Sequence, residues 1–270
     1  MSYNPGDDQV AMIEAQKPQY LQIADLLRSR IEDGTYPAGT QMPSEPELSA
    51  ELGVSRVTVN RAITVLRSTG DVKVRRGAGT FVRRAPKINR DAVARYAARG
   101  RGTGAGQVEV HALNRESRTD YREIGKTNAS ADVARVLNIG KAADVLVRRR
   151  VLFADDEPTQ IADSYYPWSV AKNSKELLRA EVGAGGSYGR LDELGYGPVR
   201  FTEDITVRMP TDSEQRTLDL EASQPVFEIW HVAYAENDLP VEVCVHVMPG
   251  YLWNLHYAWE DRHAAQAKDD

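Results

Sequence analysis

Two short helical segments joined by a tight turn constrain the fold of this chain more than any other feature of its sequence. The first segment follows Ser44, and Glu47 completes the S-x-x-E pattern of a capping box. Gly53 ends that segment, and Ser55 is placed to cap the next one. The second segment has an apolar stripe at helical spacing, formed by Val59, Ala62, Ile63 and Leu66. This arrangement predicts a helix-turn-helix.

The neighbouring segments predict the rest of a small domain. Apolar residues at i, i+3, i+4, i+7 and i+11 indicate an earlier helix over residues 18–33, and Gly34 ends it. After the capped helices, the β-rich runs VKV and TFV flank the sequence RRGAG, which is typical of a hairpin. We therefore expect residues 1–84 to form a winged helix-turn-helix domain, mostly α-helical with a β-hairpin wing.

The second capped helix has a polar and basic outer face. If its apolar stripe is buried, the side chains left outside are those of Arg56, Val57, Asn60, Arg61, Thr64 and Arg67. The whole chain has a formal net charge of -5, yet residues 55–90 contain ten basic residues and one acidic residue. A basic segment on an acidic chain favours a polyanionic partner for that part alone.

These residue types match the chemistry by which proteins recognise double-stranded DNA. An α-helix fits the major groove, where arginine can bind guanine and asparagine can bind adenine through two hydrogen bonds. The methyl groups of Val57 and Thr58 can contact thymine, and the helix starts at the two capping serines suit phosphate groups. Arg75 and Arg76, at the tip of the hairpin, can reach phosphates or the minor groove. A helical corner that touches no DNA is the alternative interpretation.

Three motifs occur in order in this region: Pro-Ser-Glu at 43–45, Leu-Gly-Val-Ser-Arg at 52–56 and Gly-Ala-Gly-Thr-Phe-Val at 77–82. With them, residues 18–84 resemble the DNA-binding domain of the GntR family of bacterial transcription regulators. Pro46 and Asn60 stand where that family often has arginine, which implies one lost backbone contact and a different base preference. The residues and the resemblance together predict DNA contacts at Ser44, Glu45, Ser55, Arg56, Val57, Thr58, Asn60, Arg61, Arg75, Arg76, Gly77, Gly79 and Thr80.

The rest of the chain divides into a linker, a second domain and a tail. Residues 85–107 lack a periodic pattern and have glycine at positions 100, 102, 104 and 106, so we expect a linker. Residues 108–262 are predicted to form an α+β domain with antiparallel strands, and residues 263–270 a disordered tail. The predicted strands cover residues 108–113, 145–153, 159–166, 200–209, 225–235 and 240–248. The predicted helices cover residues 130–137, 187–194 and 211–220.

Two stretches of the second domain, VLVRRRVLFADDEPTQIADSYYP and LPVEVCVHV, resemble the UTRA effector-binding domain of the HutC branch of the same family. The resemblance implies a chorismate-lyase-like α+β fold with an antiparallel sheet, a small-molecule effector and a homodimer. It assigns effector contacts to Arg150, Ser187 and Glu242. Tyr165 is a further candidate for the pocket wall.

The candidate effector site differs from the family pattern at two positions. Leu152 stands where phosphosugar-binding members have a second arginine, and Ala162 stands where a carboxylate is common. Because one arginine alone binds a phosphate less strongly than two, a phosphosugar becomes a poorer match. The substitutions imply a less charged or more apolar effector.

Each of the four candidates also has a purely structural interpretation. Arg150 can pair with a carboxylate of the turn that follows its strand. Ser187 can be a helix cap, and Glu242 can be a solvated strand residue. Tyr165 can belong to the core or to the rim of a pocket.

Nothing in the sequence indicates enzymatic chemistry. The five histidines are scattered without H-x-H or H-E-x-x-H spacing, the G-x-S-x-G motif is absent and Cys244 is the only cysteine. We therefore expect no metal, no cofactor and no enzyme. The N-terminus does not resemble a signal peptide and no apolar run is long enough to span a bilayer, so we expect a cytoplasmic protein with no membrane partner.

The leading prediction is a homodimeric transcriptional repressor that binds a palindromic operator and responds to a small-molecule effector. Two other functions stay open. One is a ligand-independent DNA-binding repressor, of the kind that controls a plasmid or mobile element. The other is an enzyme whose activity lies in the second domain.

Overall fold

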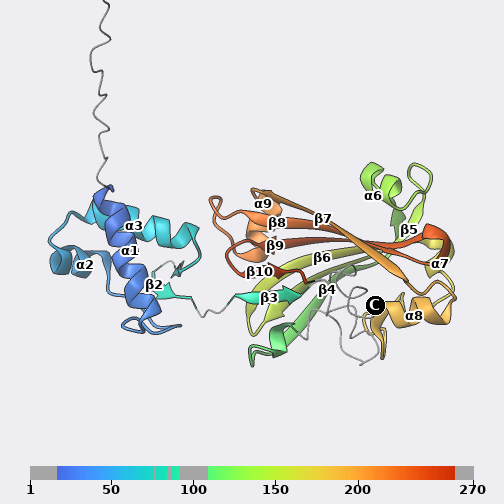
Figure 1. The fold of residues 1–270 in the computed structure, drawn as a ribbon, viewed down its shortest axis with the longest axis horizontal. Coiled ribbons are helices and arrows are strands. Elements are labelled where there is room, and N and C mark those ends of the chain that lie inside the picture. The colour runs from blue at the N-terminus through green and yellow to red at the C-terminus, as the bar shows by residue number, and fades with distance from the viewer. Residues whose placement is uncertain (1–16, 76, 84–86, 92–108, 259–270) are drawn as a thin grey trace, which may run out of the picture. The chain divides into compact units, whose positions relative to one another are not determined.

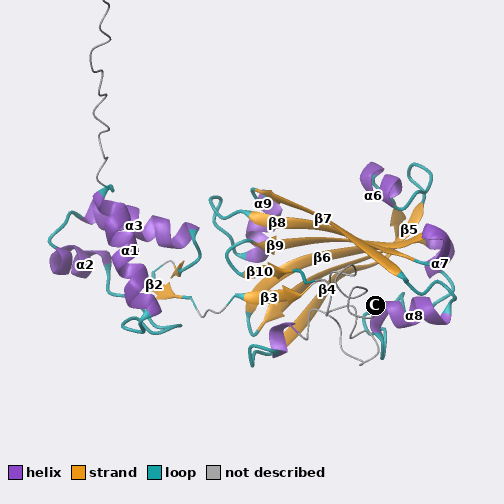
Figure 2. Cartoon of the chain, in the orientation of Figure 1, coloured by secondary structure: helices purple, strands orange, loops and turns teal. Residues whose placement is uncertain are grey.

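The computed structural model describes residues 17–75, 77–83, 87–91 and 109–258. The chain divides into two compact units, Met1–Arg84 and Ala85–Asp270, and each unit has its own hydrophobic core. Figure 1 labels most of the elements of each unit, and Figure 2 colours the helices and the strands differently. The tail predicted at 263–270 lies outside the described residues, as do residues 85–86 and 92–107 of the predicted linker.

The first unit consists of three helices and a two-stranded hairpin (Figure 1). Its elements are α1 (Gln19–Glu32), α2 (Glu45–Leu52), α3 (Arg56–Ser68), β1 (Val72–Arg75) and β2 (Gly79–Val82). The two strands pair antiparallel along their whole length. This arrangement confirms the predicted winged helix-turn-helix with its hairpin wing.

One apolar stripe from each helix forms the core of the first unit. Leu27, Leu48 and Leu66, one from each helix, are fully buried, and Val82 of the wing packs in the same cluster. Gly53, between α2 and α3, has φ 63° and ψ 32°. Glycine adopts this left-handed conformation without a steric penalty, so the turn between the two helices stays tight.

The second unit is built on a six-stranded antiparallel sheet with the strand order β4-β5-β6-β9-β8-β7. The strands are β4 (Ser117–Asn128), β5 (Asp144–Ala154), β6 (Glu157–Pro167), β7 (Arg200–Arg208), β8 (Val226–Tyr234) and β9 (Pro240–Pro249). The helices around it include α6 (Ala131–Val136), α7 (Trp168–Ala171), α8 (Gly186–Glu193) and α9 (Asp212–Leu218). This architecture confirms the predicted α+β fold.

The pairing register assigns each candidate residue to one face of the sheet, because directly paired residues share a face. One row crosses β5, β6, β9, β8 and β7 and consists of Arg148, Ser164, Cys244, His231 and Glu203. The face with this row also carries Arg150 and is called the Arg150 face. The opposite face carries Tyr165 and is called the Tyr165 face. Helices α7 and α8 pack on the Arg150 face, and α6 and α9 pack on the Tyr165 face.

The structure corrects two predicted segments. Residues 88–91, predicted as part of the linker, form β3 (Ile88–Asp91), which pairs in parallel with β10 (Trp253–His256). Ile88 is fully buried against Trp253, so this short segment is a packed strand. The strand predicted at 108–113 is also wrong, because residues 109–111 are helical.

Among the helices that the structure describes, none combines the length and the apolar character needed to cross a membrane.

Candidate functional site

Helix α3 presents a polar surface because its start is capped and one side of it is buried. Ser55 Oγ accepts a hydrogen bond from the Thr58 backbone N–H at 3.1 Å and lies 2.8 Å from Thr58 Oγ1. Val59 is fully buried, whereas Arg56 is exposed and Val57 is 67% exposed. A valine this exposed, beside an arginine in the first helical turn, suits contact with base edges and thymine methyl groups.

Three more of the predicted DNA contacts, Glu45, Asn60 and Arg61, also interact with residues of the same unit. Asn60 Nδ2 donates to Glu45 Oε1 at 2.8 Å, which ties α3 to the start of α2. The Arg61 guanidinium lies 6.0 Å from the centroid of the Tyr20 ring of α1. Asn60 is therefore positioned by Glu45 at the surface of α3, a contact that sequence reasoning missed because the two residues are fifteen positions apart.

The wing has a backbone that requires glycine. Gly77 and Gly79 have φ of 78° and 103°, and a Cβ atom at Gly79 would lie 2.6 Å from Gln41 Nε2. The Arg75 guanidinium lies 4.7 Å from the centroid of the Phe81 ring, and the Thr80 carbonyl accepts from the Met42 N–H at 2.8 Å. Arg76 lies outside the described residues. The glycines therefore keep the hairpin tip narrow next to Arg75.

The start of α2 is a complete capping box. Ser44 Oγ accepts from the Glu47 N–H, and the Ser44 N–H donates back to Glu47 Oε2 at 2.7 Å. The hydrogen bonds from the Ser44 side chain and backbone hold the pKa of Glu47 below its usual range. This end of α2, with its oriented N–H groups, is suited to a DNA phosphate.

Ser44→Ala is expected to lower the free energy of unfolding of the first unit by about 0.5–2 kcal/mol, because it removes the cap. The pKa of Glu47 is lower in the folded protein than in the unfolded chain. The stabilisation that its carboxylate gives is therefore present above the unfolded pKa and is lost as the pH falls through the folded pKa. The loss of unfolding free energy caused by Ser44→Ala should therefore be smaller at acidic pH.

Urea unfolding at neutral and acidic pH measures this loss, and Ser29→Ala, at an exposed position, is the control. Equal losses for Ser44→Ala and Ser29→Ala would contradict a stabilising role of the capping box.

Arg150 lies at the centre of a polar cluster on the Arg150 face. Its Nη1 donates to Ser164 Oγ at 3.0 Å and to the Arg148 carbonyl at 3.3 Å, and its Nη2 lies 3.8 Å from Cys244 Sγ. Asp155 and Glu157, the carboxylates of the following turn, are instead bound by Arg115 at 2.9 and 3.1 Å. The interpretation of Arg150 as a partner of that turn is therefore wrong.

Glu242 joins the same cluster and is not a solvated strand residue. It is 4% exposed and accepts a hydrogen bond of 2.6 Å from Tyr166 Oη. Burial raises the pKa of the nearby Cys244 thiol to about 11, so this thiol stays neutral at pH 7. Carboxylate, phenol and guanidinium groups therefore gather on one face, beside a thiol that behaves as a small apolar group.

The two departures from the family pattern lie together beside Arg150. Leu152, Ala162 and Cys244 form a small buried apolar cluster, and Ala162 is paired directly with Arg150 across β5 and β6. An apolar wall therefore stands next to the single arginine, where the family pattern has further charged groups.

Ser187 lies in the first turn of α8 and is not its cap, because that position belongs to Gly185. The helix-cap interpretation of Ser187 is therefore wrong. The next residue, Tyr188, lies with its Oη 3.0 Å from His231 Nε2. This contact joins α8 to the row of residues that crosses the Arg150 face.

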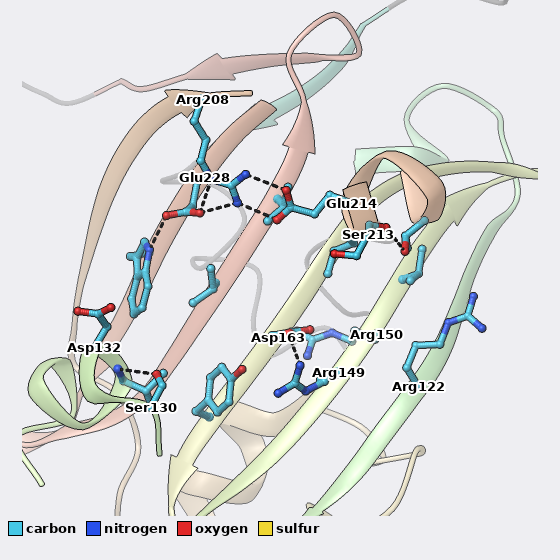
Figure 3. Close-up of a pocket in the computed structure, with 18 of the residues that line it drawn as sticks. Arg122, Ser130, Asp132, Arg149, Arg150, Asp163, Arg208, Ser213, Glu214 and Glu228 are labelled. Carbon is cyan, nitrogen blue, oxygen red and sulfur yellow. Dashed lines mark hydrogen bonds and ion pairs between the residues drawn. The ribbon is translucent and has the colours of Figure 1, made fainter. Parts of the chain in front are cut away.

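Tyr165 lies on the Tyr165 face, where a cavity of about 880 Å³ opens between α6 and α9 (Figure 3). Burial raises the pKa values of Tyr165 and of neighbouring Asp163. At the α9 end, Arg208 is bound to Glu214 and Glu228 at 2.7 Å. Arg150 also lines this cavity, but its guanidinium bonds on the other face. The four predicted effector residues therefore do not form one site.

The described residues contain no group of three or more histidine, cysteine, aspartate or glutamate side chains that could hold a metal ion.

Two family models match the chain. The UTRA domain matches residues 112–251, and the model described as "Bacterial regulatory proteins, gntR family" matches residues 19–82. The first match covers the six-stranded sheet and the second covers the three helices and the wing.

Named relatives resemble the chain over most of its length. An uncharacterized HTH-type transcriptional regulator of Streptomyces coelicolor, SCO4628, is 28% identical over 94% of this chain and 97% of its own. The HTH-type transcriptional repressor NagR of Bacillus subtilis is 26% identical over 89% and 94%. A probable repressor of the fructoselysine utilization operon of Escherichia coli is 27% identical over 83% and 87%.

Solved structures agree with the fold. A crystal structure described as a GntR-family transcriptional regulator is 26% identical, has a TM-score of 0.59 and covers 91% of this chain and 99% of its own. PhnF from Mycobacterium smegmatis has a TM-score of 0.56 over 88% and 99% at 24% identity, which shows the shared fold alone.

Proposed function

The chain belongs to the gntR family of bacterial regulatory proteins, in the branch that carries a UTRA domain, and we infer that it is a DNA-binding transcriptional repressor controlled by a small molecule. The observation that carries the DNA-binding part is the surface of α3. Its capped start, its buried stripe and its exposed Arg56 and Val57 make a helix shaped for the major groove. Two of its relatives are named as repressors, which supports repression rather than activation of the regulated genes.

Binding to DNA that flanks its own gene tests this function, because regulators of this kind often act on adjacent genes. Fluorescence anisotropy at a fixed salt concentration should show the full chain binding one such fragment about 10³-fold or more tightly than a shuffled sequence. Equal affinities for every flanking fragment and its shuffled control would count against the proposal.

We propose that the chain acts as a homodimer whose contacts come mainly from residues 108–270. One winged domain contacts few bases, and a two-fold operator doubles the contacts when its half-sites lie about one helical turn apart. Sedimentation at micromolar concentration should show a dimer of the 30.0 kDa chain. A monomer both with and without DNA would refute this part.

For the effector we propose the Arg150 face. Arg150, Glu242 and the hydroxyl groups of Ser164 and Tyr166 supply donors and acceptors within one buried cluster. Leu152 and Ala162 add the apolar wall beside them. This combination suits a small polar molecule with few charges. One relative is named for fructoselysine utilization, which supports a metabolite as the ligand.

Arg150→Ala is expected to leave operator affinity within about twofold of the wild type and to abolish release by the effector. Arg150 anchors the cluster on the Arg150 face, whereas the DNA-reading residues belong to the first unit. A thermal-shift screen of sugars, amino acids and their derivatives identifies the compound, and anisotropy measures release. Tyr165→Phe, on the opposite face, is the matched control. If the effector still releases Arg150→Ala from operator DNA as it releases the wild type, the effector does not bind at the Arg150 face.

A further inference from the structure

Arg90 is a buried arginine whose hydrogen-bonding capacity is mostly unused. It lies on β3, its side chain is fully buried, and its Nη2 is paired with Glu203 Oε1. Its Nε and Nη1 atoms are buried without a hydrogen-bond partner. A buried donor without an acceptor destabilises the folded protein, and does so more strongly when the group is charged. A buried donor of this kind is expected to bind an acceptor in at least one functional state of the protein.

Arg148 shows how this sheet satisfies a buried arginine elsewhere. Its Nη1 donates to the carbonyls of Leu177 and Arg179, and its Nη2 donates to Tyr121 Oη at 3.1 Å and to the Ala180 carbonyl at 3.1 Å. Four acceptors therefore surround the Arg148 guanidinium. Arg90, in contrast, has a single carboxylate.

That carboxylate is itself shared among several donors. Glu203 Oε1 lies 3.1 Å from His231 Nδ1, and Glu203 Oε2 accepts from Tyr257 Oη at 2.8 Å. His231 Nε2 in turn contacts Tyr188 Oη of α8, one residue after Ser187. A continuous chain of contacts therefore runs from β3, through β7 and β8, to the helix that carries Ser187.

Arg90 and Arg150 flank the same row of residues. Arg90 binds Glu203 on β7, and Arg150 approaches Cys244 on β9. Glu203, His231 and Cys244 are paired directly across β7, β8 and β9. Because neighbouring strands are about 4.8 Å apart, these two points of contact are roughly 10 Å apart on one face.

We propose that Arg90 is an effector-contacting residue and that the effector carries an oxyanion, a carboxylate or a phosphate, that binds its unpartnered nitrogen atoms. Guanidinium groups bind both oxyanions with strong, charge-assisted hydrogen bonds. The inference rests on the proposed function, because it takes the Arg150 face as the effector site.

The position of Arg90 also provides a route from the effector to the DNA-binding unit. Its two unpartnered atoms are closed to water, so the packing around Arg90 must open for an oxyanion to reach them. Residues 83–87 alone separate β3 from β2, the last strand of the wing. Binding at Arg90 therefore changes the anchor of the segment that follows the DNA-binding unit.

Thermal unfolding of the full chain tests the contact with two probes, sodium phosphate and sodium acetate, against sodium chloride at matched ionic strength. At ten times its dissociation constant, an oxyanion should raise the wild-type Tm by about 3–5 °C. Arg90→Gln should lose this rise. Arg115→Gln, which removes a partly buried arginine paired with Asp155 and Glu157, should keep it. That control also corrects for the general stabilisation that phosphate gives to folded proteins.

Amide hydrogen exchange of residues 88–91 separates a contact from a purely structural role. The effective oxyanion should change exchange there in the wild type and in Arg115→Gln, and not in Arg90→Gln. If circular dichroism shows that Arg90→Gln is unfolded, Arg90→Lys, which keeps the charge, replaces it. The oxyanion should then raise the Tm of Arg90→Lys by at most half as much as it raises the Tm of the wild type.

Three results would overturn the inference. The oxyanion could raise the Tm of the wild type and of the Arg90 variant equally, Arg115→Gln could lose the rise in Tm as Arg90→Gln does, or neither oxyanion could raise the Tm of the wild type. None of these results contradicts the proposed function if the chain still binds a specific operator. Loss of specific DNA binding would instead refute the proposed function.

Discussion

Arg56→Ala is expected to weaken operator binding by about 1–3 kcal/mol, or roughly 5- to 150-fold. Arg56 is the first residue of α3 and is exposed next to Val57, so its guanidinium can reach a base edge near the start of the helix. Binding to random duplex should fall much less, because that binding comes from phosphate attraction shared among many basic residues. Anisotropy titrations of both duplexes at one salt concentration measure the two losses.

Two other arginines serve as controls for this experiment. Arg75→Ala, on the wing, should weaken binding to operator and random duplex alike, because we expect Arg75 to contact phosphates or the minor groove rather than base edges in the major groove. Arg200→Ala removes the same charge from the second unit, where Arg200 pairs with Asp238, and should change neither affinity beyond about twofold. Equal losses on both duplexes for Arg56→Ala would remove its base-reading role.

Trp253→Ala is expected to lower the free energy of unfolding of the second unit by about 3–5 kcal/mol. Trp253 is 2% exposed and packs with Ile88, Ile229 and Met248, and its Nε1–H donates to the Thr159 carbonyl at 2.8 Å. The substitution leaves a cavity and a buried carbonyl without its donor. Because Trp253 pairs with Ile88, it should also release β3 and increase amide exchange at residues 88–91. Urea unfolding followed by circular dichroism measures the loss.

The size of the Trp253 effect is judged against two variants. Trp253→Phe keeps most of the packing and should cost less than Trp253→Ala. Val207→Ala changes a side chain on β7 that is 63% exposed, so the free energy of unfolding should stay within about 0.5 kcal/mol of the wild type. A loss below about 1 kcal/mol for Trp253→Ala would show that β10 does not hold this side of the core.

The first unit could be predicted from sequence because its determining interactions are local. Ser44 and Ser55 cap the helices that follow them, and Gly53 makes the turn, all within twelve residues. Local hydrogen bonds and helical spacing therefore decide the fold there. The bond between Asn60 and Glu45 was missed because it depends on how α2 and α3 pack.

The second unit was harder to predict because its strands depend on distant partners. β4 has the sequence SRTDYREIGKTN, and charged residues along this edge strand hide the alternation that identifies a strand. β3 is four residues long and is a strand because Ile88 and Arg90 are buried by segments more than a hundred positions away. No local pattern contains that information.

The effector candidates show which signals could have been used. Tyr165 and Tyr166 are adjacent on a strand, so alternation predicts that their side chains point to opposite faces and that only one of them can join the effector cluster. The structure shows that Tyr166, not Tyr165, lies beside Glu242. The pairing register, which the sequence does not give, places Arg150 and Ala162 on the same face. The importance of Arg90 could not be predicted, because its burial and its missing acceptors depend on β7 and β10.

Selection of bound sequences from a random pool of duplex DNA, with the full chain, tests the central claim most directly. A regulator that reads bases through α3 should enrich one motif with two-fold symmetry, whose half-sites lie about one helical turn apart. Arg56→Ala should lose the preference at one position in each half-site. A pool that remains random after repeated rounds, together with equal binding to unrelated duplexes, would contradict sequence-specific regulation by this chain.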